Sequence, residues 1–412
     1  MHDTTLYATI LGVEAPWKVT DVIPRLDEGE IVVRVKVPAG VQLGCPKCGV
    51  ERPRHDHRTR RWRHLPTCQY RTILEVDVPR VRCEEHGVHQ IEVPWAESNS
   101  AFTALYEALV ISWLKEASIS AVADLMQLTW DQVDGIMQRA VRRGLARRIP
   151  GQLRRIGIDE TSFQKRHEYI TVVSDSDSSD VLFVADDRKA KSLQGFFDER
   201  EPLELATIES VAMDMWKPFI SVVEKNIWKA EQKICFDKFH VAKYLGDGVD
   251  KVRRQEHRKL LDEGNRTLTG TKYRWLQNPE NMSHRASKSL KDLKRMVLKT
   301  ARAWALKEHA MCLWGYVSRG WARKAWTGWI SWAMRSRLEP MKQVARMIRV
   351  HLWGIINAIV LRATNAGSES INSRIQRIKR MACGFRNRER FRNAIYFHLG
   401  GLDLSPATHT RS

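Results

Sequence analysis

Two pairs of metal-binding residue types constrain the fold of this 412-residue chain more than any other feature of its sequence. Cys45 and Cys48 enclose two residues, and Cys83 and His86 enclose two more, so the pairs have equal spacing. A structural zinc ion takes four sulfur or nitrogen ligands in a tetrahedron, which two such pairs supply when a β-hairpin brings them together. Gly49 follows the first pair and suits the tight turn that the pair requires. The sequence therefore predicts a zinc-binding β module near the N-terminus.

The same residues allow other assignments. His89 and Cys68 are alternatives to His86 as the fourth ligand, and the cysteines could instead be unrelated buried thiols. A thioredoxin-like redox pair is disfavoured because Cys45 lies in no βαβ pattern. The seven cysteines, four of them in residues 45–83, also argue against a secreted disulfide scaffold, because their number is odd and the chain is long.

The charge of the chain indicates a polyanionic partner. Lys and Arg number 68 and Asp and Glu number 48, which gives a net charge of +20 and a pI near 9.8. A membrane partner is not expected, because the longest uncharged apolar run, residues 350–361, is shorter than the ~20 residues of a spanning helix. Residues 1–17 contain Asp3 and Glu14 and lack the basic-then-apolar order of a secretory signal. We therefore expect a cytoplasmic, reduced protein that binds nucleic acid.

Patterning divides the chain into segments and predicts the α/β class. Residues 1–100 contain short alternating strands such as 73–78, and residues 101–150 have helical spacing. Short apolar runs that end in acidic residues alternate with helical stretches in 151–249, whereas 250–355 is all-helical in pattern. Residues 356–404 begin another amphipathic helix, and 405–412 form a tail without a pattern.

Three arginine-rich runs are candidates for DNA contacts, although a solvated surface is the ordinary explanation for any one of them. The first run lies between the two cysteine pairs and is expected to be a zinc-braced loop with Arg52, Arg54, Arg58, Arg60, Arg61 and Arg63. The second, residues 139–155, includes Arg142, Arg143, Arg147 and Arg148. The third, residues 374–392, includes Arg377, Lys379, Arg380 and Arg386.

The second run follows a predicted helix-turn-helix. Residues 118–126 have a helical pattern, Gln127 and Leu128 form a short turn, and Thr129 caps the next helix. Helical hairpins also occur in ordinary cores, but the adjacent arginines favour the DNA-binding interpretation. Thr129 and Gln132, at the start of the presumed recognition helix, are the candidates for reading bases.

Two aspartates end predicted strands. Asp159 ends the run 156–159, and Asp214 ends the run 207–214. Ligands of α/β folds bind at such strand ends, although a single strand-end aspartate is more often structural. Clustered carboxylates repel one another unless hard cations neutralise them, so a cluster would imply magnesium or manganese. Two such metals support phosphodiester chemistry.

Glu369 is a third candidate, at the start of a helix. The helix follows a break at residues 365–368, and its isoleucines at 371, 375 and 378 share one face. Glu369, Asn372 and Gln376 share another face, so the glutamate is expected to point away from the packed side of its helix.

Six segments in order resemble a known family. They are GIDETS at 157–162, YITVV at 169–173, VAMDM at 211–215, FDKFHV at 236–241, TNAGSESIN at 364–372 and KRMACGFRN at 379–387. Together with the cysteine knuckle and the helix-turn-helix, they resemble the bacterial insertion-sequence transposases of the ISL (ISL three) type, which belong to the DDE superfamily. The resemblance spans nearly the whole chain.

The resemblance implies a ribonuclease-H-like mixed-sheet core, in two parts at 151–249 and 356–404, interrupted by an all-helical insertion at 250–355. It implies a catalytic triad of Asp159, Asp214 and Glu369 that holds Mg²⁺ or Mn²⁺. Asp237, which also ends a strand-like run at 233–236, is the alternative second acid. Together with His240, however, it looks like the structural Asp-x-x-His element that follows the second acid in related cores. His86 stands where the family more often has cysteine.

The implied activity is binding of the element's terminal inverted repeats, cleavage at its ends and joining of the 3′ ends to target DNA. The implied state on double-stranded DNA is a homodimer or higher oligomer, associated with the bacterial nucleoid. Two rivals remain: a non-catalytic zinc-finger regulator, and a ribonuclease-H-like nuclease or resolvase that does not join strands.

Overall fold

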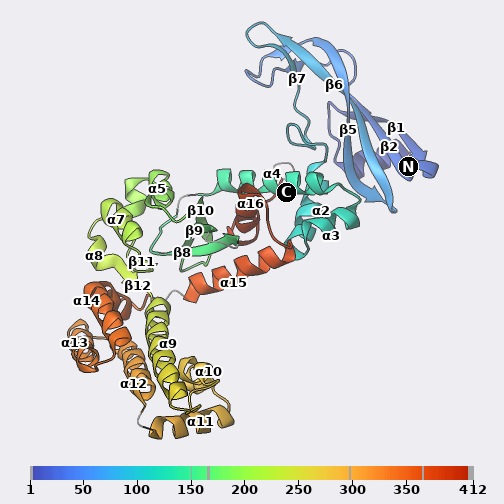
Figure 1. Cartoon of the computed structure of the whole chain (residues 1–412). Helices are drawn as coiled ribbons and strands as arrows, with labels where there is room; N and C mark the ends of the chain where they lie inside the picture. Colours follow the sequence, from blue (N-terminus) through green and yellow to red (C-terminus); the bar gives the residue numbers. More distant parts are fainter. Residues whose placement is uncertain (1–2, 150, 165–167, 297, 364–365, 407–412) are drawn as a thin grey trace. The chain divides into compact units, whose positions relative to one another are not determined.

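The computed structural model describes residues 3–149, 151–164, 168–296, 298–363 and 366–406 (Figure 1). Its contacts divide the chain into two compact units. The first contains Met1–Arg148 and Leu402–Ser412, and the second contains Ile149–Gly401. The predicted boundary at residue 404 differs from this division, because the chain rejoins the first unit after Gly401. No helix in the described ranges is long and apolar enough to cross a membrane.

The first unit begins with a β module. A mixed sheet has the order β1-β2-β6-β5, and β7 also pairs with β6, while β3 and β4 form a separate ribbon. Valines alternate along β2 and β6, and their buried side chains pack around Trp62. The elements are α1 (Asp3–Leu11), β1 (Lys18–Arg25), β2 (Glu30–Lys36), β3 (Leu43–Gly44), β4 (Glu51–Arg52), β5 (Arg54–Thr67), β6 (Tyr70–Cys83) and β7 (Gly87–Gln90).

The arginine-rich segment between the cysteine pairs is not the loop that we expected. Most of it is strand β5, which pairs antiparallel with β6 from Arg54↔Val81 to Thr67↔Tyr70. The alternation that marks a strand begins only at Trp62 and His64, because the preceding residues of β5 are mostly polar and exposed. A polar edge strand has no hydrophobic period, so its sequence resembles a loop.

Three helices of the first unit form the predicted helix-turn-helix: α2 (Ala104–Glu116), α3 (Ile119–Met126) and α4 (Trp130–Arg147). Gln127 ends α3 with a φ of 50°, in the left-handed region. Thr129 and Gln132 then form a capping box, in which each side chain accepts a hydrogen bond from the other's backbone N–H. The predicted turn and cap are therefore confirmed.

The second unit contains a mixed sheet in the order β10-β9-β8-β11-β12. Strands β8, β9 and β10 pair antiparallel, whereas β8, β11 and β12 run parallel. The elements here are β8 (Arg155–Gln164), β9 (Glu168–Asp175), β10 (Val181–Asp186), α5 (Ala190–Asp198), α6 (Pro202–Ala206), β11 (Ser210–Met213), α7 (Lys217–Asn226), α8 (Ala230–Lys233) and β12 (Ile234–Phe236).

Helices follow the last strand without interruption by another strand in the described part of residues 238–399. They are α9 (Lys238–Asp262), α10 (Lys272–Leu276), α11 (His284–Arg295), α12 (Lys299–Cys312), α13 (Arg319–Arg335), α14 (Glu339–Val360), α15 (Ala366–Met381) and α16 (Arg388–Leu399). Trp275, Trp326 and Trp329 are fully buried among them. These three tryptophans therefore belong to the core of the segment, whereas Trp321 and Trp332 are exposed.

Helix α14 joins the helical segment to the sheet. Asn357 donates hydrogen bonds to the carbonyls of Glu231 and Ile234, at 2.8 and 2.9 Å. Gly354 lies against the ring of Phe236 so closely that any Cβ at this position would overlap the ring. The absence of a side chain therefore lets α14 approach the end of β12.

Candidate active site and zinc-ligand cluster

Three aspartates lie in a row across the parallel strands. The register pairs Ala212 of β11 with Gly157 of β8, so its continuation by two residues sets Asp214 beside Asp159. The pair Met213↔Phe236 likewise continues to Asp214 beside Asp237. Adjacent strands are ~4.8 Å apart, and residues at one level of a parallel sheet share a face. The fold thus gathers three carboxylates that are 23 to 78 residues apart in the sequence.

Electrostatics agree with this placement. Burial raises the pKa of Asp159, and the nearby carboxylates of Asp237 and Asp214 raise it further. His240, in the first turn of α9, opposes that rise, and its Nδ1 lies 3.7 Å from Oδ2 of Asp214. Burial also raises the pKa of Glu160, which faces Arg188 at 3.5 Å. The row is therefore a site of unfavourable negative charge, which a cation would neutralise.

Helix α15 lies along β8 through polar contacts. Asn372 Nδ2 donates to Oδ2 of Asp159 at 2.8 Å, and Gln376 Nε2 donates to Oγ1 of Thr161 at 3.0 Å. Lys379 Nζ donates to the carbonyl of Ser162 at 2.8 Å. Ile371, Ile375 and Ile378 are buried on another face of the helix, as their spacing predicts.

Glu369 belongs to α15, one turn before Asn372, but its side chain is outside the described residues. The contact between Asn372 and Asp159 nevertheless places this face of the helix at the aspartate row. The sequence had placed Asn372 on the face of Glu369 without assigning it a role. Its spacing of three residues from the glutamate was the available signal.

The donor set of the row suits a hard divalent cation. Carboxylate oxygens are the preferred ligands of Mg²⁺, and Asp159, Asp214 and Asp237 supply them. Oδ1 of Asn372 is buried and has no hydrogen-bond partner among the described atoms, although its Nδ2 is bonded to Asp159. An unpaired buried amide oxygen beside a carboxylate row is a further potential oxygen ligand.

The four predicted zinc ligands meet in one cluster. Cys45 and Cys48 lie in the turn between β3 and β4, and Cys83 and His86 lie at the turn between β6 and β7. One ligand atom from each lies within 4.8 Å of every other. Cys48 Sγ and Cys83 Sγ are 3.7 Å apart, and Cys83 Sγ is 3.5 Å from His86 Nδ1. A tetrahedron with Zn–S bonds of about 2.3 Å has edges of about 3.8 Å, so the spacing fits zinc.

The alternative fourth ligands do not join the cluster. Cys68 lies at the opposite end of the β5–β6 hairpin, in the turn beside Gln69. His89 uses its Nε2 in a 2.6 Å contact with the carbonyl of His86. Side-chain and backbone hydrogen bonds from His86 lower the pKa of Cys83 to about 6, which favours the thiolate that binds metal.

Three family models match successive parts of the chain. The model of the ISL3-type DDE enzyme, described as "Transposase", matches residues 156–395. A "zinc-finger of transposase IS204/IS1001/IS1096/IS1165" matches residues 43–86, and a "Helix-turn-helix domain of transposase family ISL3" matches residues 91–141. The chain belongs to the ISL3 family of transposases.

Curated relatives agree with this membership. The ISL3 transposase is 30% identical to the "Transposase for insertion sequence element IS1557" of Mycobacterium tuberculosis, over 94% of this chain and 93% of the relative. It is 28% identical to the "Transposase for insertion sequence element IS1001" of Bordetella parapertussis, over 87% of this chain and 89% of the relative. The family and the α/β fold class predicted from the sequence are confirmed, and the chain is a DDE DNA transposase.

Several of the arginines that we considered for DNA contacts are engaged within the transposase itself. In the β module, these residues bind carboxylates, carbonyls or an aromatic ring: Arg52, Arg54, Arg60, Arg61 and Arg63. Arg63 donates to the carbonyl of Gln127 at 2.9 Å and lies over the ring of Tyr106, so it supports the turn of the helix-turn-helix.

Arginines of the second run, residues 139–155, are also engaged in contacts within the protein. The side chain of Arg143 is only 9% exposed and binds Glu97 at 2.7 Å and the carbonyls of Leu404 and Ser405 at 3.0 Å. Arg147 binds Asp403 and the carbonyl of Ser405. Arg143 is therefore not available for phosphates in this arrangement, and it holds the returning C-terminal residues against α4.

The remaining predicted residues differ in exposure. Arg148 and Lys379 are half-buried, and burial lowers the pKa of Lys379. Among these remaining residues, the exposed ones are Arg58, Thr129, Gln132, Arg142, Arg377, Arg380 and Arg386.

Proposed function

We propose that this transposase cleaves DNA at the ends of its insertion sequence and joins the 3′ ends to target DNA. In this proposal, Asp159, Asp214 and Glu369 hold two Mg²⁺ or Mn²⁺ ions. Ions bound there would activate the attacking oxygen and stabilise the leaving oxygen of the phosphodiester. The observation that carries the proposal is the hydrogen bond from α15 to Asp159, because it joins the helix of Glu369 to the aspartate row.

Asp214 is preferred over Asp237 as the second acid. It follows β11, the strand directly beside β8, whereas Asp237 follows β12, one strand further away. The Asp214 side chain is 36% exposed, whereas Asp237 is only 4% exposed and lies directly before α9. The metal ion that the second acid holds must be accessible to the scissile phosphate, so the more exposed carboxylate suits that role.

Asn372 acts in this proposal as a positioning residue. Its amide holds one oxygen of Asp159, and the N–H of Glu160 holds the other at 2.7 Å. Both bonds fix the orientation of the carboxylate before a metal binds, which is the usual function of groups behind metal ligands.

The first unit would bind the terminal inverted repeats. The zinc cluster would fix the two hairpins that carry it, and α4 would enter the major groove with Gln132 near its start. Exposed Arg58 and Arg142 are suited to phosphates beside that groove, and Arg377, Arg380 and Arg386 to phosphates near the aspartate row. We propose a homodimer or higher oligomer on double-stranded DNA, in the bacterial cytoplasm and at the nucleoid.

A cleavage and joining assay on labelled repeat-end duplexes tests the proposal. Asp159→Ala, Asp214→Ala and Glu369→Ala are each expected to abolish cleavage while end binding is retained. Normal cleavage by Asp214→Ala together with loss in Asp237→Ala would reassign the second acid. Binding without any cleavage by the unaltered protein would favour a regulator, and cleavage without joined products would favour a nuclease or resolvase.

A further inference from the structure

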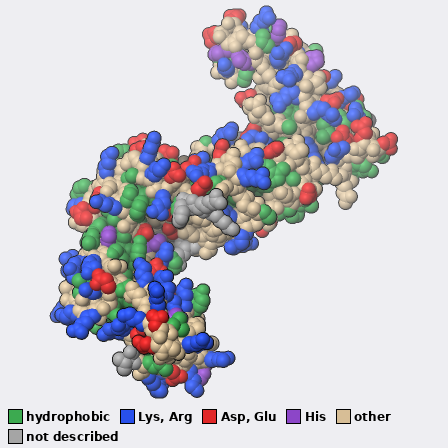
Figure 2. All heavy atoms as spheres, in the orientation of Figure 1, with side chains coloured by type: hydrophobic (Ala, Val, Ile, Leu, Met, Phe, Trp, Pro, Cys, Tyr) green, Lys and Arg blue, Asp and Glu red, His purple; other side chains and the backbone are tan. Residues whose placement is uncertain are grey.

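Most of the net positive charge of the transposase lies in its helical segment 250–355. Residues 250–355 contain 24 Lys and Arg against 8 Asp and Glu, a net charge of +16 within a chain total of +20. None of the three arginine-rich runs that we considered for DNA contacts lies in this segment. Figure 2 shows Lys and Arg side chains gathered over the helices that α9 begins.

Helix α11 organises part of this charge into a stripe. His284, Lys288, Lys291 and Arg295 recur at spacings of four, three and four residues and are exposed. This spacing keeps side chains on one face of a helix. Leu290 and Leu293, the buried residues of α11, lie on the opposite face. The helix therefore packs with one side and presents a row of cations with the other.

The stripe has little negative charge to balance it. Asp292 is the only acidic residue of α11, and its Oδ1 lies 4.0 Å from Nη1 of Arg295. Like charges one turn apart destabilise a helix. An unbalanced row of cations is therefore unfavourable in the free protein and becomes favourable against a row of anions.

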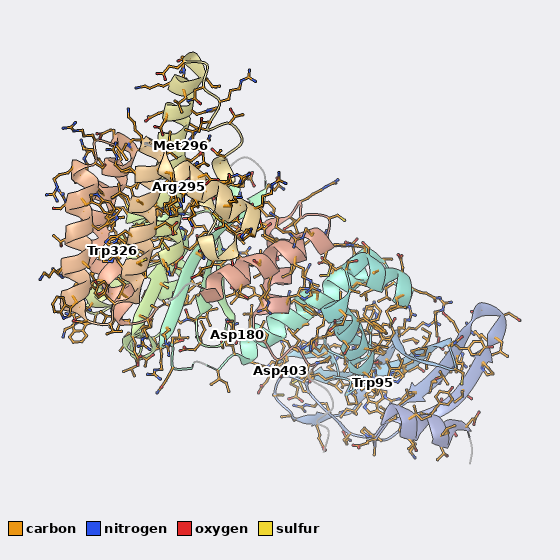
Figure 3. The ribbon with its side chains drawn as sticks, turned by 90° about the horizontal axis from the view of Figure 1, so that it is seen from below. Trp95, Asp180, Arg295, Met296, Trp326 and Asp403 are labelled. Carbon is orange, nitrogen blue, oxygen red and sulfur yellow. The ribbon has the colours of Figure 1, made fainter. Side chains whose placement is uncertain are left out.

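Helix α9 places the C-terminal end of α11 relative to the aspartate row. Helix α9 begins directly after Asp237, and Glu256 near its other end accepts hydrogen bonds from the backbone N–H groups of Lys299 and Thr300. These two residues begin α12, just beyond α11, whose end carries the labelled Arg295 in Figure 3. From Lys238 to Glu256, α9 spans about 27 Å at 1.5 Å per residue.

We propose that the cationic face of α11 binds the phosphates of duplex DNA about eight base pairs from the cleavage site. The value of eight base pairs is the span of α9, about 27 Å, divided by the 3.4 Å rise per base pair of the duplex. A straight row of cations on a rigid helix matches a regular row of phosphates and reads no bases, so this contact is independent of sequence. It rests on the proposed function in that the bound polyanion is the DNA being cut.

The test compares two matched double variants of the full chain, Lys288→Gln/Lys291→Gln and Lys191→Gln/Lys225→Gln. Lys191 and Lys225 are exposed on α5 and α7, so both variants lose two charges from helix surfaces. Affinity for a scrambled duplex, measured at several salt concentrations, should show a salt slope reduced by about 1.8 for the α11 variant, at about 0.9 per phosphate contact. The control variant should keep the slope of the unaltered protein.

A hydroxyl-radical footprint on a repeat-end duplex gives the second readout. Protection about eight base pairs from the cleavage site should disappear in the α11 variant and persist in the control. An unchanged slope, or equal loss in both variants, would overturn the proposal. A change in the oligomeric state of the DNA-free α11 variant would also overturn it, since the stripe would then bind another copy of the chain. These assays need no cleavage, so their failure is distinguishable from failure of the proposed chemistry.

Discussion

Arg142 and Arg143 are neighbours with the same side chain, yet the structure predicts opposite results when each is replaced by alanine. Arg143 is nearly buried and binds Glu97, Leu404 and Ser405, and its Nη1 is 3.6 Å from Oε2 of Glu107. Arg142 is exposed. Arg143→Ala should therefore destabilise the first unit, whereas Arg142→Ala should weaken DNA binding and leave stability unchanged.

The expected loss of free energy of unfolding depends on which buried charges lose a partner. Removing one partner of a buried ion pair costs about 3–5 kcal/mol. Glu107 retains Arg139, at 2.6 Å, and Ser100, so we expect about 3 kcal/mol, at the low end of that range. At about 2–4 °C per kcal/mol for a domain of this size, the Tm of the first unit falls by about 6–12 °C. Arg142→Ala should change the free energy of unfolding by less than about 0.5 kcal/mol.

Calorimetry of the full chain measures this effect. The transition of the first unit is the one that should shift on zinc chelation, because the cysteine cluster lies in that unit. The second measurement is the affinity for repeat-end DNA at several salt concentrations. Arg142→Ala should reduce the slope of log affinity against log salt concentration by about 0.9. The reasoning fails if Arg143→Ala keeps the Tm within about 2 °C of the unaltered protein while it reduces the salt slope.

Three further predictions concern the metal sites. A zinc assay should give one zinc per chain, and Cys45→Ala should lower both the zinc content and the Tm of the first unit. A metal-free protein with an unchanged Tm would contradict a structural zinc site. Asp159→Asn should raise the Tm in chelator at neutral pH. Burial raises the pKa of Asp159, so its charge destabilises the folded state above the folded-state pKa. This destabilisation vanishes as the pH falls below the ordinary pKa of an aspartate. An unchanged Tm of Asp159→Asn at neutral pH would argue against the burial of the charge. Asn372→Ala should raise the Mg²⁺ concentration needed for half-maximal cleavage by about 10–100-fold, whereas the control Gln376→Ala should leave it unchanged. Equal effects of both substitutions would indicate that α15 acts only through packing.

The zinc-ligand cluster and the helix-turn-helix were predictable from the sequence because each depends on residues close together. The two-residue gap within each ligand pair is a local constraint, and the capping box of Thr129 and Gln132 spans three positions. The isoleucine spacing of α15 likewise predicted its buried face. Strand β5 could not be predicted, because its polar edge residues lack the alternation that packing imposes.

The positions of the three aspartates at strand ends were not enough to predict that they lie side by side. The sequence placed Asp159, Asp214 and Asp237 each after an apolar run, but only the sheet register sets them at one level. Strand order is not encoded in any one strand, since it results from how helices cover both faces of the sheet. The helical spacing set Asn372 on the face of Glu369, but its contact with Asp159 could not be read from the sequence, because the two residues are 213 positions apart.

What the sequence determined by itself was the chemistry of the transposase: its ligand types, its acids, its net charge and its local helices and turns. The tertiary structure alone decided which charges are free to act. Arg143 becomes structural because the chain returns to α4 after more than 250 residues, while Lys288 and Lys291 stay exposed because Leu290 and Leu293 turn the other face of α11 inward. The physical reason is that propensity and periodicity act over a few residues, whereas the burial and pairing of a charge depend on whatever the fold brings within a few ångströms of it.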